Sequence, residues 1–367
     1  MFVCNSSGSM YNFRAHTLRY LLNMNFDVIV VAPKDESSKL IVEMGCTFIH
    51  MPMNPKGVNP FADLVLLFKL SILYYRVKPN LIFHFTIKPN IYGSIASGIF
   101  KIPSVAVVTG LGYAFINDNI ISRFARILYK IGLSFSNEVW FLNSDDKDFF
   151  VTSGIIAWRR AFILPGEGID TDFYAYSKPN QKSTFTFLFI GRLLVDKGIR
   201  EYVCAARMMY KKQPNCKFLI VGDCDAKNPT VIKKSELDEW MSDGYIEYLG
   251  TTTDVRKFIA NADCVVLPSY REGLPRVLLE AASIGRAIIA TDAPGCKDVV
   301  KHEINGFLCK IKDVNDLYRQ MHKIISSEYE TIIRLGIVGR DMILSKYGVD
   351  TINNIYLERI KKIIGVR

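Results

Sequence analysis

Short apolar runs alternate with amphipathic stretches along the whole chain. In the first half, apolar runs predict strands at residues 2–4, 28–32, 47–51, 81–85, 104–109, 139–143 and 162–164, and helical patterns fill the intervals at 12–24, 37–44, 61–77, 90–100, 120–135 and 145–152. The second half restarts the alternation with a strand at 185–190 and a helix that ends at Lys212. Strands that alternate with helices are typical of parallel, doubly wound sheets, whose ligands gather at the carboxyl ends of the strands. The pattern therefore predicts an α/β protein.

The remainder of the second half continues this pattern. Further apolar runs lie at 218–221, 245–250, 264–267 and 306–308, and helical patterns lie at 254–260, 277–284, 314–326, 331–346 and 351–364. We therefore expect a second parallel sheet.

A turn-rich segment divides the two halves. Residues 164–173 combine a proline, two glycines and three acids, a composition typical of connectors. We therefore expect a first domain at residues 1–165, a linker at 166–183, a second domain at 184–345 and a closing helix within 346–367. At 367 residues the chain is long enough for two domains with separate cores.

Composition narrows the class of partner. Hydrophobic residues make up 49% of the chain and charged residues 22%, which excludes disorder. The net charge is +10, and residues 60–135 carry +6 of it, from eight Lys and Arg against two Asp. A basic field of this size favours anionic partners such as phosphates or acidic lipids. Because no zinc-finger, RNA-binding or helix-turn-helix pattern occurs, we do not expect nucleic acid as a partner.

The cysteines and the apolar runs bear on location. Eight cysteines are scattered without a C-x-x-C pair, and several lie in apolar runs, as is usual for reduced core thiols of a cytosolic protein. The sequence contains neither a signal peptide nor an uninterrupted apolar run of about 18 residues. We therefore predict no spanning helix.

The most informative chemistry lies in a strand–loop–helix unit at residues 264–284. Its loop and helix contribute two carboxylates with an intervening turn: Glu272, Gly273, Leu274, Pro275 and Glu280. Paired carboxylates accept hydrogen bonds from vicinal hydroxyls, and free N–H groups at a helix N-terminus suit a phosphate. The unit therefore predicts a site for a phosphorylated, polyhydroxylated ligand.

This unit resembles the signature of the retaining glycosyltransferases of family 4. The resemblance rests on the seven residues between Glu272 and Glu280, on the preceding Pro-Ser-x-x-Glu-Gly and on the following Pro294 and Gly295. It implies the GT-B architecture, in which two Rossmann-like doubly wound α/β domains face a central cleft and the last helix crosses back to the first domain. It also implies that Glu272 contacts the donor sugar and Glu280 the nucleotide ribose.

A second loop supplies cations. Arg192 and Lys197 follow the strand at 185–190 and are flanked by Gly191 and Gly198, wording that the family shares. Two cations there can clamp the diphosphate of a nucleotide sugar and stabilise the charge that develops as it leaves. We therefore predict Glu272, Arg192 and Lys197 as catalytic residues, with Gly191 among the donor-binding residues. Since this pair does the work of a metal, we expect no metal or other cofactor and discount the Asp-x-Asp sequences at 170–172 and 223–225.

Loops after strands of the first domain supply further candidates. Gly8, a candidate donor-binding residue, would let another backbone or a diphosphate approach closely; the alternative is a plain turn between strand and helix. The candidate acceptor-binding residues are Arg14, His84, Lys88, Asn90 and Tyr113. A cation at Lys88 suits a phosphorylated acceptor, whereas His84 is either a sugar contact or a satisfied strand histidine. The wording of residues 86–93 resembles the branch that extends undecaprenyl-diphosphate-linked sugars, as in the N-acetylgalactosaminyltransferases of bacterial glycan assembly.

Two helices combine cations with bulky apolar residues. Arg123, Arg126 and Lys130 share one stripe of the helix at 120–135, and the helix at 61–78 carries three more cations. Such helices lie at an interface when acyl chains meet the apolar face and headgroups meet the cations. The alternative is a pair of core helices with solvated lysines. We predict an anionic membrane surface as a partner and a cytoplasmic protein that is peripheral on the inner face of the plasma membrane.

Together these patterns predict a metal-independent, retaining hexosyltransferase. It would move a sugar from a nucleotide donor, such as UDP-GalNAc, UDP-GlcNAc or UDP-Gal, to a polyprenyl-diphosphate-linked saccharide in capsule, O-antigen or related glycan assembly. One alternative is a sugar-nucleotide epimerase or a glycogen-synthase-like transferase of the same architecture. Another is a non-catalytic nucleotide-binding subunit of a glycan assembly complex.

Overall fold

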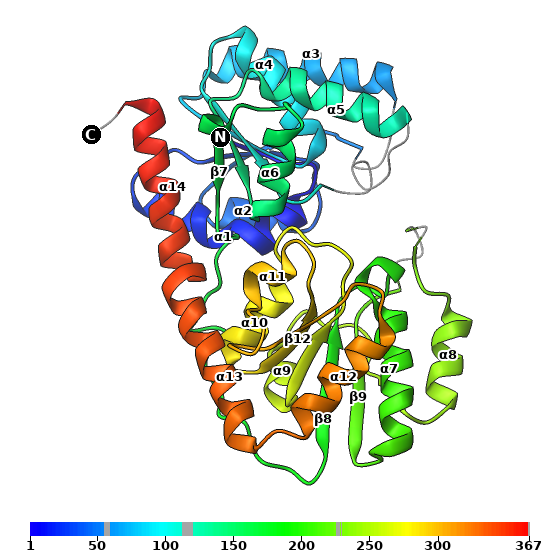
Figure 1. Ribbon diagram of the computed structural model, residues 1–367. Helices are drawn as coiled ribbons and strands as arrows, with labels where there is room; N and C mark the ends of the chain where they lie inside the picture. The colour runs from blue at the N-terminus through cyan, green and yellow to red at the C-terminus, as the bar shows by residue number, and fades with distance from the viewer. Residues whose placement is uncertain (55–58, 112–119, 225–227, 229, 366–367) are drawn as a thin grey trace. The chain divides into compact units, whose positions relative to one another are not determined.

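The chain forms two compact units in the computed structural model, which describes residues 1–54, 59–111, 120–224, 228 and 230–365, the side chains of 120–122 excepted. The first unit comprises Met1–Gly168 and Val349–Arg367, and the second comprises Ile169–Gly348. In each unit helices cover a parallel sheet (Figure 1). The predicted α/β class is confirmed.

The first unit contains a seven-stranded parallel sheet in the order β3-β2-β1-β4-β5-β6-β7. Its strands are β1 (Phe2–Val3), β2 (Ile29–Ala32), β3 (Thr47–His50), β4 (Ile82–Phe85), β5 (Ser104–Val108), β6 (Glu138–Phe141) and β7 (Ala161–Ile163). Its α-helices are α1 (Ser7–Asn23), α2 (Ser37–Glu43), α3 (Pro60–Val77), α4 (Ser94–Ile99), α5 (Ile120–Leu133), α6 (Ser144–Thr152) and α14 (Val349–Ile364). Phe2 pairs with Val30 on one side and with Phe83 on the other, so β1 is an interior strand.

The last helix, α14, completes the core of this unit. Tyr356 packs its ring against Phe2, Phe83 and Trp140, with ring centroids 6.3, 5.3 and 5.1 Å apart. Arg359 forms an ion pair with Glu138 of β6. Such aromatic contacts each add about 0.5–1.5 kcal/mol beyond burial of their area, so α14 is an integral part of the unit.

The second unit contains a six-stranded parallel sheet in the order β10-β9-β8-β11-β12-β13. Its strands are β8 (Phe185–Ile190), β9 (Cys216–Val221), β10 (Ile246–Tyr248), β11 (Cys264–Leu267), β12 (Ala287–Thr291) and β13 (Phe307–Cys309). Its α-helices are α7 (Ile199–Lys212), α8 (Lys234–Ser242), α9 (Arg256–Asn261), α10 (Arg276–Ile284), α11 (Cys296–Val299), α12 (Val314–Ile325) and α13 (Tyr329–Met342).

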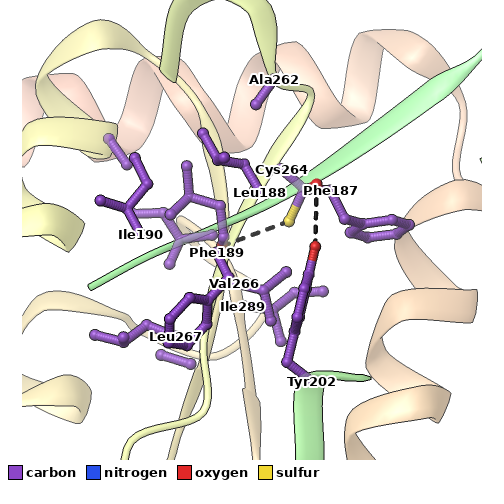
Figure 2. Packing of buried hydrophobic residues seen from close by; sticks show 14 of the residues in the cluster. Phe187, Leu188, Phe189, Ile190, Tyr202, Ala262, Cys264, Val266, Leu267 and Ile289 are labelled. Atoms are coloured by element: carbon purple, nitrogen blue, oxygen red, sulfur yellow. Dashed lines mark hydrogen bonds between the residues drawn. The ribbon is translucent and has the colours of Figure 1, made fainter. Parts of the chain in front are cut away.

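Apolar side chains fill both faces of the central strands β8 and β11. Figure 2 shows Phe187, Val266 and Ile289 within this core. The Tyr202 hydroxyl, the polar group that α7 brings into it, donates to the carbonyl oxygens of Phe187 and Leu219 at 3.1 and 3.2 Å. A strand buried on both faces reads as a continuous apolar run, which is why the sequence marks β8 and β11 so clearly.

In both sheets the strand order reverses direction at one point. The reversal lies between β1 and β4 in the first unit and between β8 and β11 in the second. Ligands of open parallel sheets bind outside the carboxyl ends of the strands at such a switch point. Each unit therefore has one favoured place for a ligand.

Several elements differ from the expected boundaries. Helix α1 begins at Ser7, five residues before its expected start, because the Ser6 side chain caps it by accepting from the Ser9 N–H. The helix expected at 90–100 is a π-helical turn, Pro89–Gly93, followed by α4. Residues 169–183, expected as a linker, pack within the second unit, where the Ser177 N–H donates to the Ile284 carbonyl at 3.1 Å.

Candidate active site

An ion pair links two loops at the switch point of the second unit. Lys197 ends a 3-10 turn in the loop after β8, and Glu272 lies in the loop after β11. The Lys197 Nζ pairs with the Glu272 Oε1, and their side chains are 22% and 12% exposed. The structure thus brings together two of the three residues predicted as catalytic, at the edge where a ligand is expected.

Gly198 explains why these two loops can approach so closely. It adopts a φ of 71°, and a Cβ at this position would lie 2.0 Å from the Pro268 carbonyl oxygen. The backbone N–H of Tyr270 donates to the Asp196 carbonyl at 2.9 Å and so fixes the contact. Only glycine combines a left-handed backbone with no side chain.

A third loop, after β12, contacts the backbone of the Glu272 loop. The Glu272 N–H donates to the Pro294 carbonyl at 3.0 Å. Gly295 has a φ of 79°, and a Cβ there would lie 2.6 Å from the Glu272 carbonyl oxygen. The Pro294-Gly295 sequence therefore acts as the backbone support of the acidic loop.

Glu280 lies in α10 and is 7% exposed. Its Oε1 accepts from the Tyr174 hydroxyl at 2.8 Å and from the Arg276 Nε at 2.9 Å. Burial, followed by the charge of Glu280, raises the pKa of Tyr174 above its usual value, so the phenol stays a donor. Both bonds go to one oxygen, and Oε2 accepts none from the residues that the structure describes.

The sequence reasoning missed both partners of Glu280. Arg276 stands four residues before Glu280 on one helix face, a spacing that predicts an ion pair. Tyr174 is 106 residues distant along the chain, so no local signal connects the two residues.

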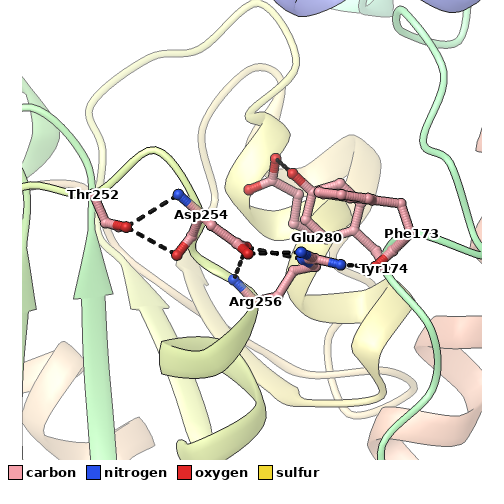
Figure 3. Close-up of polar contacts among 6 residues, drawn as sticks. All are labelled: Phe173, Tyr174, Thr252, Asp254, Arg256 and Glu280. Carbon is pink, nitrogen blue, oxygen red and sulfur yellow. Dashed lines mark hydrogen bonds and ion pairs between the residues drawn. The ribbon is translucent and has the colours of Figure 1, made fainter.

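A row of polar contacts leads from the loop after β10 toward Glu280 (Figure 3). Arg256 binds Asp254 through Nε and Nη2 at 2.9 and 2.7 Å, and these hydrogen bonds lower the pKa of Asp254 to about 2. The Arg256 guanidinium lies 3.6 Å from the ring centroid of Phe173, the residue before Tyr174. This row holds the segment that carries Tyr174 in place.

The other predicted donor-binding residues occupy the same loops. Arg192 is exposed beside Gly191, and its side chain forms no hydrogen bond or ion pair with the described part of the chain. Gly273 and Leu274 are half-buried. Pro275 occupies the N-cap position of α10, directly before Arg276.

The Asp-x-Asp sequence at 170–172 forms no metal-binding cluster in the described structure, and Asp225 of the second Asp-x-Asp sequence lies outside the described residues. The Asp170 Oδ1 accepts from the N–H groups of Asp172 and Phe173 at 3.0 and 2.9 Å, so this carboxylate stabilises a turn. Within the described residues, no group of three or more His, Cys, Asp and Glu side chains is arranged to hold a metal ion.

Gly8 lies in the first turn of α1 and has a carboxylate partner. Its N–H donates to the Asp35 Oδ2 at 3.1 Å, so a carboxylate occupies the place expected for a phosphate. A Cβ on Gly8 would find its nearest neighbour, the Ser37 Oγ, at 3.6 Å, which is ordinary van der Waals contact. The structure therefore gives no reason to assign Gly8 to the donor.

The environments of Arg14 and His84 bear on their predicted acceptor contacts. Arg14 is 3% exposed, pairs with Glu167 and lies 4.0 Å from the Phe85 ring centroid, so its guanidinium is not presented to an acceptor. His84 is 0% exposed. Its Nε2 lies 3.0 Å from the Tyr74 hydroxyl and its Nδ1 lies 3.3 Å from the Ser94 Oγ. His84 is the satisfied strand histidine rather than a sugar contact.

Lys88 and Asn90 lie after β4, at the switch point of the first unit. The Lys88 Nζ pairs with the Asp63 Oδ1 at 2.7 Å. Asn90 is buried and its Nδ2 donates to the Val107 carbonyl at 3.0 Å. Tyr113, the last predicted acceptor residue, lies outside the described residues.

Of the three cations predicted to meet a membrane, Arg123 and Lys130 are exposed on α5. Arg126 is half-buried, and its guanidinium lies 5.5 Å from the Phe149 ring centroid. Arg126 therefore belongs to the packing of the unit, which corrects the expectation of a single cationic stripe. None of the helices that the structure describes is long and apolar enough to cross a bilayer.

Family comparisons cover both halves of the chain. Residues 2–143 match the family described as Glycosyl transferase 4-like, and residues 184–327 match the family described as Glycosyl transferases group 1. The N,N'-diacetylbacillosaminyl-diphospho-undecaprenol alpha-1,3-N-acetylgalactosaminyltransferase of Campylobacter jejuni is 28% identical over 344 residues, which cover 89% of each chain. The UDP-Gal:alpha-D-GlcNAc-diphosphoundecaprenol alpha-1,3-galactosyltransferase of Escherichia coli is 23% identical over 93% of this chain and 91% of the relative.

Solved structures share the fold. Anabaena HepE in complex with UDP superposes with a TM-score of 0.80 and 18% identity, over 98% of this chain and 99% of that chain. The two parallel-sheet units thus form the GT-B fold that the resemblance implies. With both halves matched by glycosyltransferase families, the chain belongs to the group 1 and family 4-like glycosyltransferases and is a hexosyltransferase.

Proposed function

We propose that the protein is a retaining, metal-independent transferase that moves a hexose from a UDP-sugar to a polyprenyl-diphosphate-linked saccharide in capsule or O-antigen assembly. The observation that carries the proposal is the Lys197–Glu272 ion pair at the switch point of the second unit, with Glu280 on the adjoining helix. These are the charges that a nucleotide sugar requires: a cation for the diphosphate and carboxylates for the hydroxyls.

The pair defines a role for each residue. A lysine ammonium has three N–H donors, so Lys197 can keep its bond to Glu272 and still donate to a diphosphate oxygen. Arg192, exposed in the same loop, supplies a second cation. Glu272, oriented by Lys197, accepts from hydroxyls of the donor sugar. The Oε2 of Glu280 accepts from the ribose while Tyr174 and Arg276 hold Oε1.

In the transfer, the bond between the anomeric carbon and the β-phosphate oxygen breaks as the acceptor hydroxyl oxygen bonds to the same face of that carbon. The acceptor proton passes to the leaving phosphate oxygen, so atoms and charge balance without a protein base. Arg192 and Lys197 stabilise the negative charge that grows on the diphosphate, which is the largest contribution a site without a metal can make.

The names of the relatives support the donor and acceptor classes. The Campylobacter and Escherichia relatives are both named for transfer to diphospho-undecaprenol-linked sugars, and the second is also named for a UDP-sugar donor. A solved structural neighbour binds UDP-glucose. A long polyprenyl chain resides in a membrane, so such a transferase must work at the bilayer surface.

Helix α3 carries an exposed apolar ridge that fits a bilayer surface. Its buried side packs in the unit through residues that include Leu66, Leu70 and Tyr74. Its other side exposes large hydrophobic residues at helical spacing, and Phe61 alone is 84% exposed. We define the α3 ridge as Phe61, Leu64, Val65, Phe68, Ile72 and Tyr75. An apolar stripe on the solvent face of a helix marks an interaction site.

Neighbouring helices extend this surface and add cations. Helices α3, α4 and α5 pack side by side in the first unit (Figure 1). Phe124, Ile127 and Ile131 of α5 are also exposed. The exposed cations are Lys69, Arg76, Lys78, Lys101, Arg123 and Lys130. Apolar side chains flanked by cations suit anionic lipids, and they favour a peripheral place on the cytoplasmic leaflet.

A turnover screen tests the proposal. UDP- and GDP-sugars are offered with polyprenyl-diphosphate-linked mono- and disaccharides, with and without EDTA, and the anomeric configuration of the product is read by NMR. We expect one UDP-sugar to be transferred with retention and no effect of EDTA. Turnover of a donor without acceptor would identify an epimerase. Nucleotide binding that is unaffected by Glu272→Ala, with no turnover of any donor, would identify a non-catalytic subunit.

A further inference from the structure

The stretch at residues 169–174 carries Tyr174 to its place beside Glu280. It opens the second unit, directly after the boundary at Gly168. The Ile169 N–H donates to the Tyr347 carbonyl at 2.8 Å, and the Tyr174 N–H closes a turn by donating to the Asp170 carbonyl at 2.9 Å. Neither bond reaches α10, the helix of Glu280, so other contacts must fix this stretch on that helix.

Tyr174 spans one turn of α10. Its hydroxyl donates to the Glu280 Oε1 at 2.8 Å (Figure 3), and its carbonyl oxygen accepts from the Ser283 Oγ at 2.8 Å. Glu280 and Ser283 are three residues apart, so they are neighbours on one face of the helix. Tyr174 is 8% exposed and Ser283 is 0% exposed. The direction of the phenol therefore depends on where the Tyr174 backbone lies over Ser283.

Arg340 of α13 fixes that backbone. Its Nη1 donates to the Tyr174 carbonyl at 2.9 Å, to the Ser283 carbonyl at 2.6 Å and to the Ser283 Oγ at 2.9 Å. Its Nη2 donates to the Thr171 carbonyl at 3.1 Å. The guanidinium is a rigid planar fork, so one side chain holds oxygen atoms of two segments in a single geometry.

The charge of Arg340 serves these carbonyl contacts. Burial lowers the pKa of the Arg340 guanidinium despite the charges of Asp172 and Asp341, and neither acid forms an ion pair with it in the described structure. Hydrogen bonds to a charged group are stronger than neutral ones. Arg256 also contacts the stretch, but its bond to the Phe173 carbonyl is long, at 3.4 Å, and exposed. Arg340 is therefore the stronger of the two arginine supports.

We propose that Arg340 is a positioning residue for the donor site: it fixes the Tyr174 backbone on α10, so that the Tyr174 hydroxyl holds one oxygen of Glu280 and leaves the other for the ribose. Arg340 acts on Glu280 through Tyr174 and is not itself a catalytic residue. The ribose in this inference rests on the proposed function, whereas the hold on Tyr174 does not.

Substitution of Arg340 tests the proposal. We expect Arg340→Met to raise the KM of the nucleotide sugar and the Kd of UDP about tenfold, up to the effect of losing the bond between Tyr174 and Glu280. The kcat should change little, because the ribose is bound equally in the ground state and the transition state. Arg340→Lys keeps the charge without the planar fork and should show most of the same loss. Arg334→Met, at an exposed arginine of the same helix, is the matched control and should bind UDP normally.

A double-mutant cycle separates positioning from a general structural role. If Arg340 acts through Tyr174, Arg340→Met/Tyr174→Phe should bind UDP no more weakly than Tyr174→Phe alone. A loss equal to the product of the two single losses would overturn the proposal. Should Arg340→Met fail to fold, Ser283→Ala replaces it in the cycle. That variant removes one hydrogen bond to the Tyr174 carbonyl and should raise the Kd of UDP about three- to tenfold.

A measurement without any ligand separates failure of this inference from failure of the proposed function. Tyrosine labelled with carbon-13 at Cζ reports the hydrogen bond of each phenol by NMR, and Tyr174→Phe assigns the Tyr174 resonance. We expect Arg340→Met to move this resonance in the same direction as Glu280→Leu, and Arg334→Met to leave it in place.

The two measurements together give distinct outcomes. A moved resonance supports the positioning role of Arg340 even if Glu280→Gln binds UDP normally, a result that would instead refute ribose binding by Glu280. An unmoved resonance in Arg340→Met would overturn the inference. Wild-type UDP affinity in Arg340→Met, when Glu280→Gln weakens binding, would overturn it as well.

Discussion

Lys197 and Glu272 are 75 residues apart in the chain, yet they form an ion pair across two loops of one sheet edge. Each loop follows a strand that borders the reversal in strand order, β8 for Lys197 and β11 for Glu272. The pair therefore depends on the topology of the second unit rather than on local sequence, and it gives the catalytic assignment a direct test.

We expect Glu272→Gln and Lys197→Met each to lower kcat/KM by about 10²–10³, the usual effect of removing one preorganised polar group from an active site. The measurement is steady-state transfer with a UDP-sugar. Glu236→Gln is the matched control, because Glu236 forms an exposed ion pair with Arg200 in the same unit. Equal activity of Glu272→Gln and Glu236→Gln would remove Glu272 from the catalytic residues.

Substitution of Gly198 should damage the site through the backbone. Gly198→Ala places a Cβ against the Pro268 carbonyl and also strains the left-handed backbone, so we expect it to lower the free energy of unfolding by more than about 1–3 kcal/mol. Gly244→Ala isolates the backbone cost, since Gly244 has a φ of 77° but open space around its Cβ position. Denaturant unfolding measures both. Similar losses in the two variants would show that the close loop approach is unimportant.

Loss of the Tyr174 hydroxyl should weaken nucleotide binding. Tyr174→Phe removes one of the two hydrogen bonds that hold Glu280, and we expect the KM of the nucleotide sugar to rise about tenfold or more, as for one hydrogen bond to a charged group. Calorimetric binding of UDP checks the same change without turnover. Tyr210→Phe, at a half-exposed tyrosine of the same unit, should leave the affinity unchanged. If Tyr174→Phe bound UDP with wild-type affinity, the role of Glu280 in recognising the ribose would be contradicted.

His84 should make stability depend on pH. Burial lowers its pKa from 6.5 to about 3, so between these values the unfolded chain binds a proton that the folded chain does not. The free energy of unfolding should therefore fall as the pH decreases below 6.5, by up to about 1.4 kcal/mol per pH unit from this residue. His84→Gln should remove this part of the slope, and His322→Gln, at the surface, should not. An identical slope in wild type and His84→Gln would contradict the burial argument.

Membrane binding should require both the α3 ridge and the cations around it. We expect two double variants, Phe61→Ser/Phe68→Ser and Arg123→Glu/Lys130→Glu, each to reduce sedimentation with phosphatidylglycerol-containing vesicles about tenfold or more. The first removes apolar side chains of the ridge. The second reverses two cations, and each lysine or arginine near an anionic surface contributes about 1 kcal/mol. Lys211→Glu/Lys361→Glu changes the net charge equally at exposed positions elsewhere. An equal loss of vesicle binding in this control would show that binding depends on net charge alone.

Much of the fold is readable because buried parallel strands are continuous apolar runs. The bounds expected for β8 and β11 agree with the structure. Helix α8 was not expected, since Lys233 before it offers no capping side chain. Strand β12 is likewise absent from the predicted strands, although Ala287–Thr291 is a short apolar run that is buried throughout.

The candidate site also contains residues that the sequence predicts and contacts that it does not. Glu272, Glu280 and Lys197 are identifiable because spacing and turn residues belong to one short segment each. The contacts of Gly8, Arg14 and His84 share a physical cause: each has a partner from elsewhere in the first unit, and such partners leave no trace in local sequence. The left-handed backbone of Thr86, with a φ of 72°, is equally invisible, since nothing in its neighbours requires a left-handed threonine.

The position of α14 has a consequence for biosynthesis. During translation the first 168 residues emerge before the helix whose Tyr356 fills their aromatic core, and the whole second unit is made in between. The aromatic core of the amino-terminal sheet is therefore completed only after residues 349–364 have been synthesised. A premature stop after residue 348 would leave Phe2, Phe83 and Trp140 uncovered, so quality control would meet the product as an aggregation-prone fragment rather than as a stable half-enzyme.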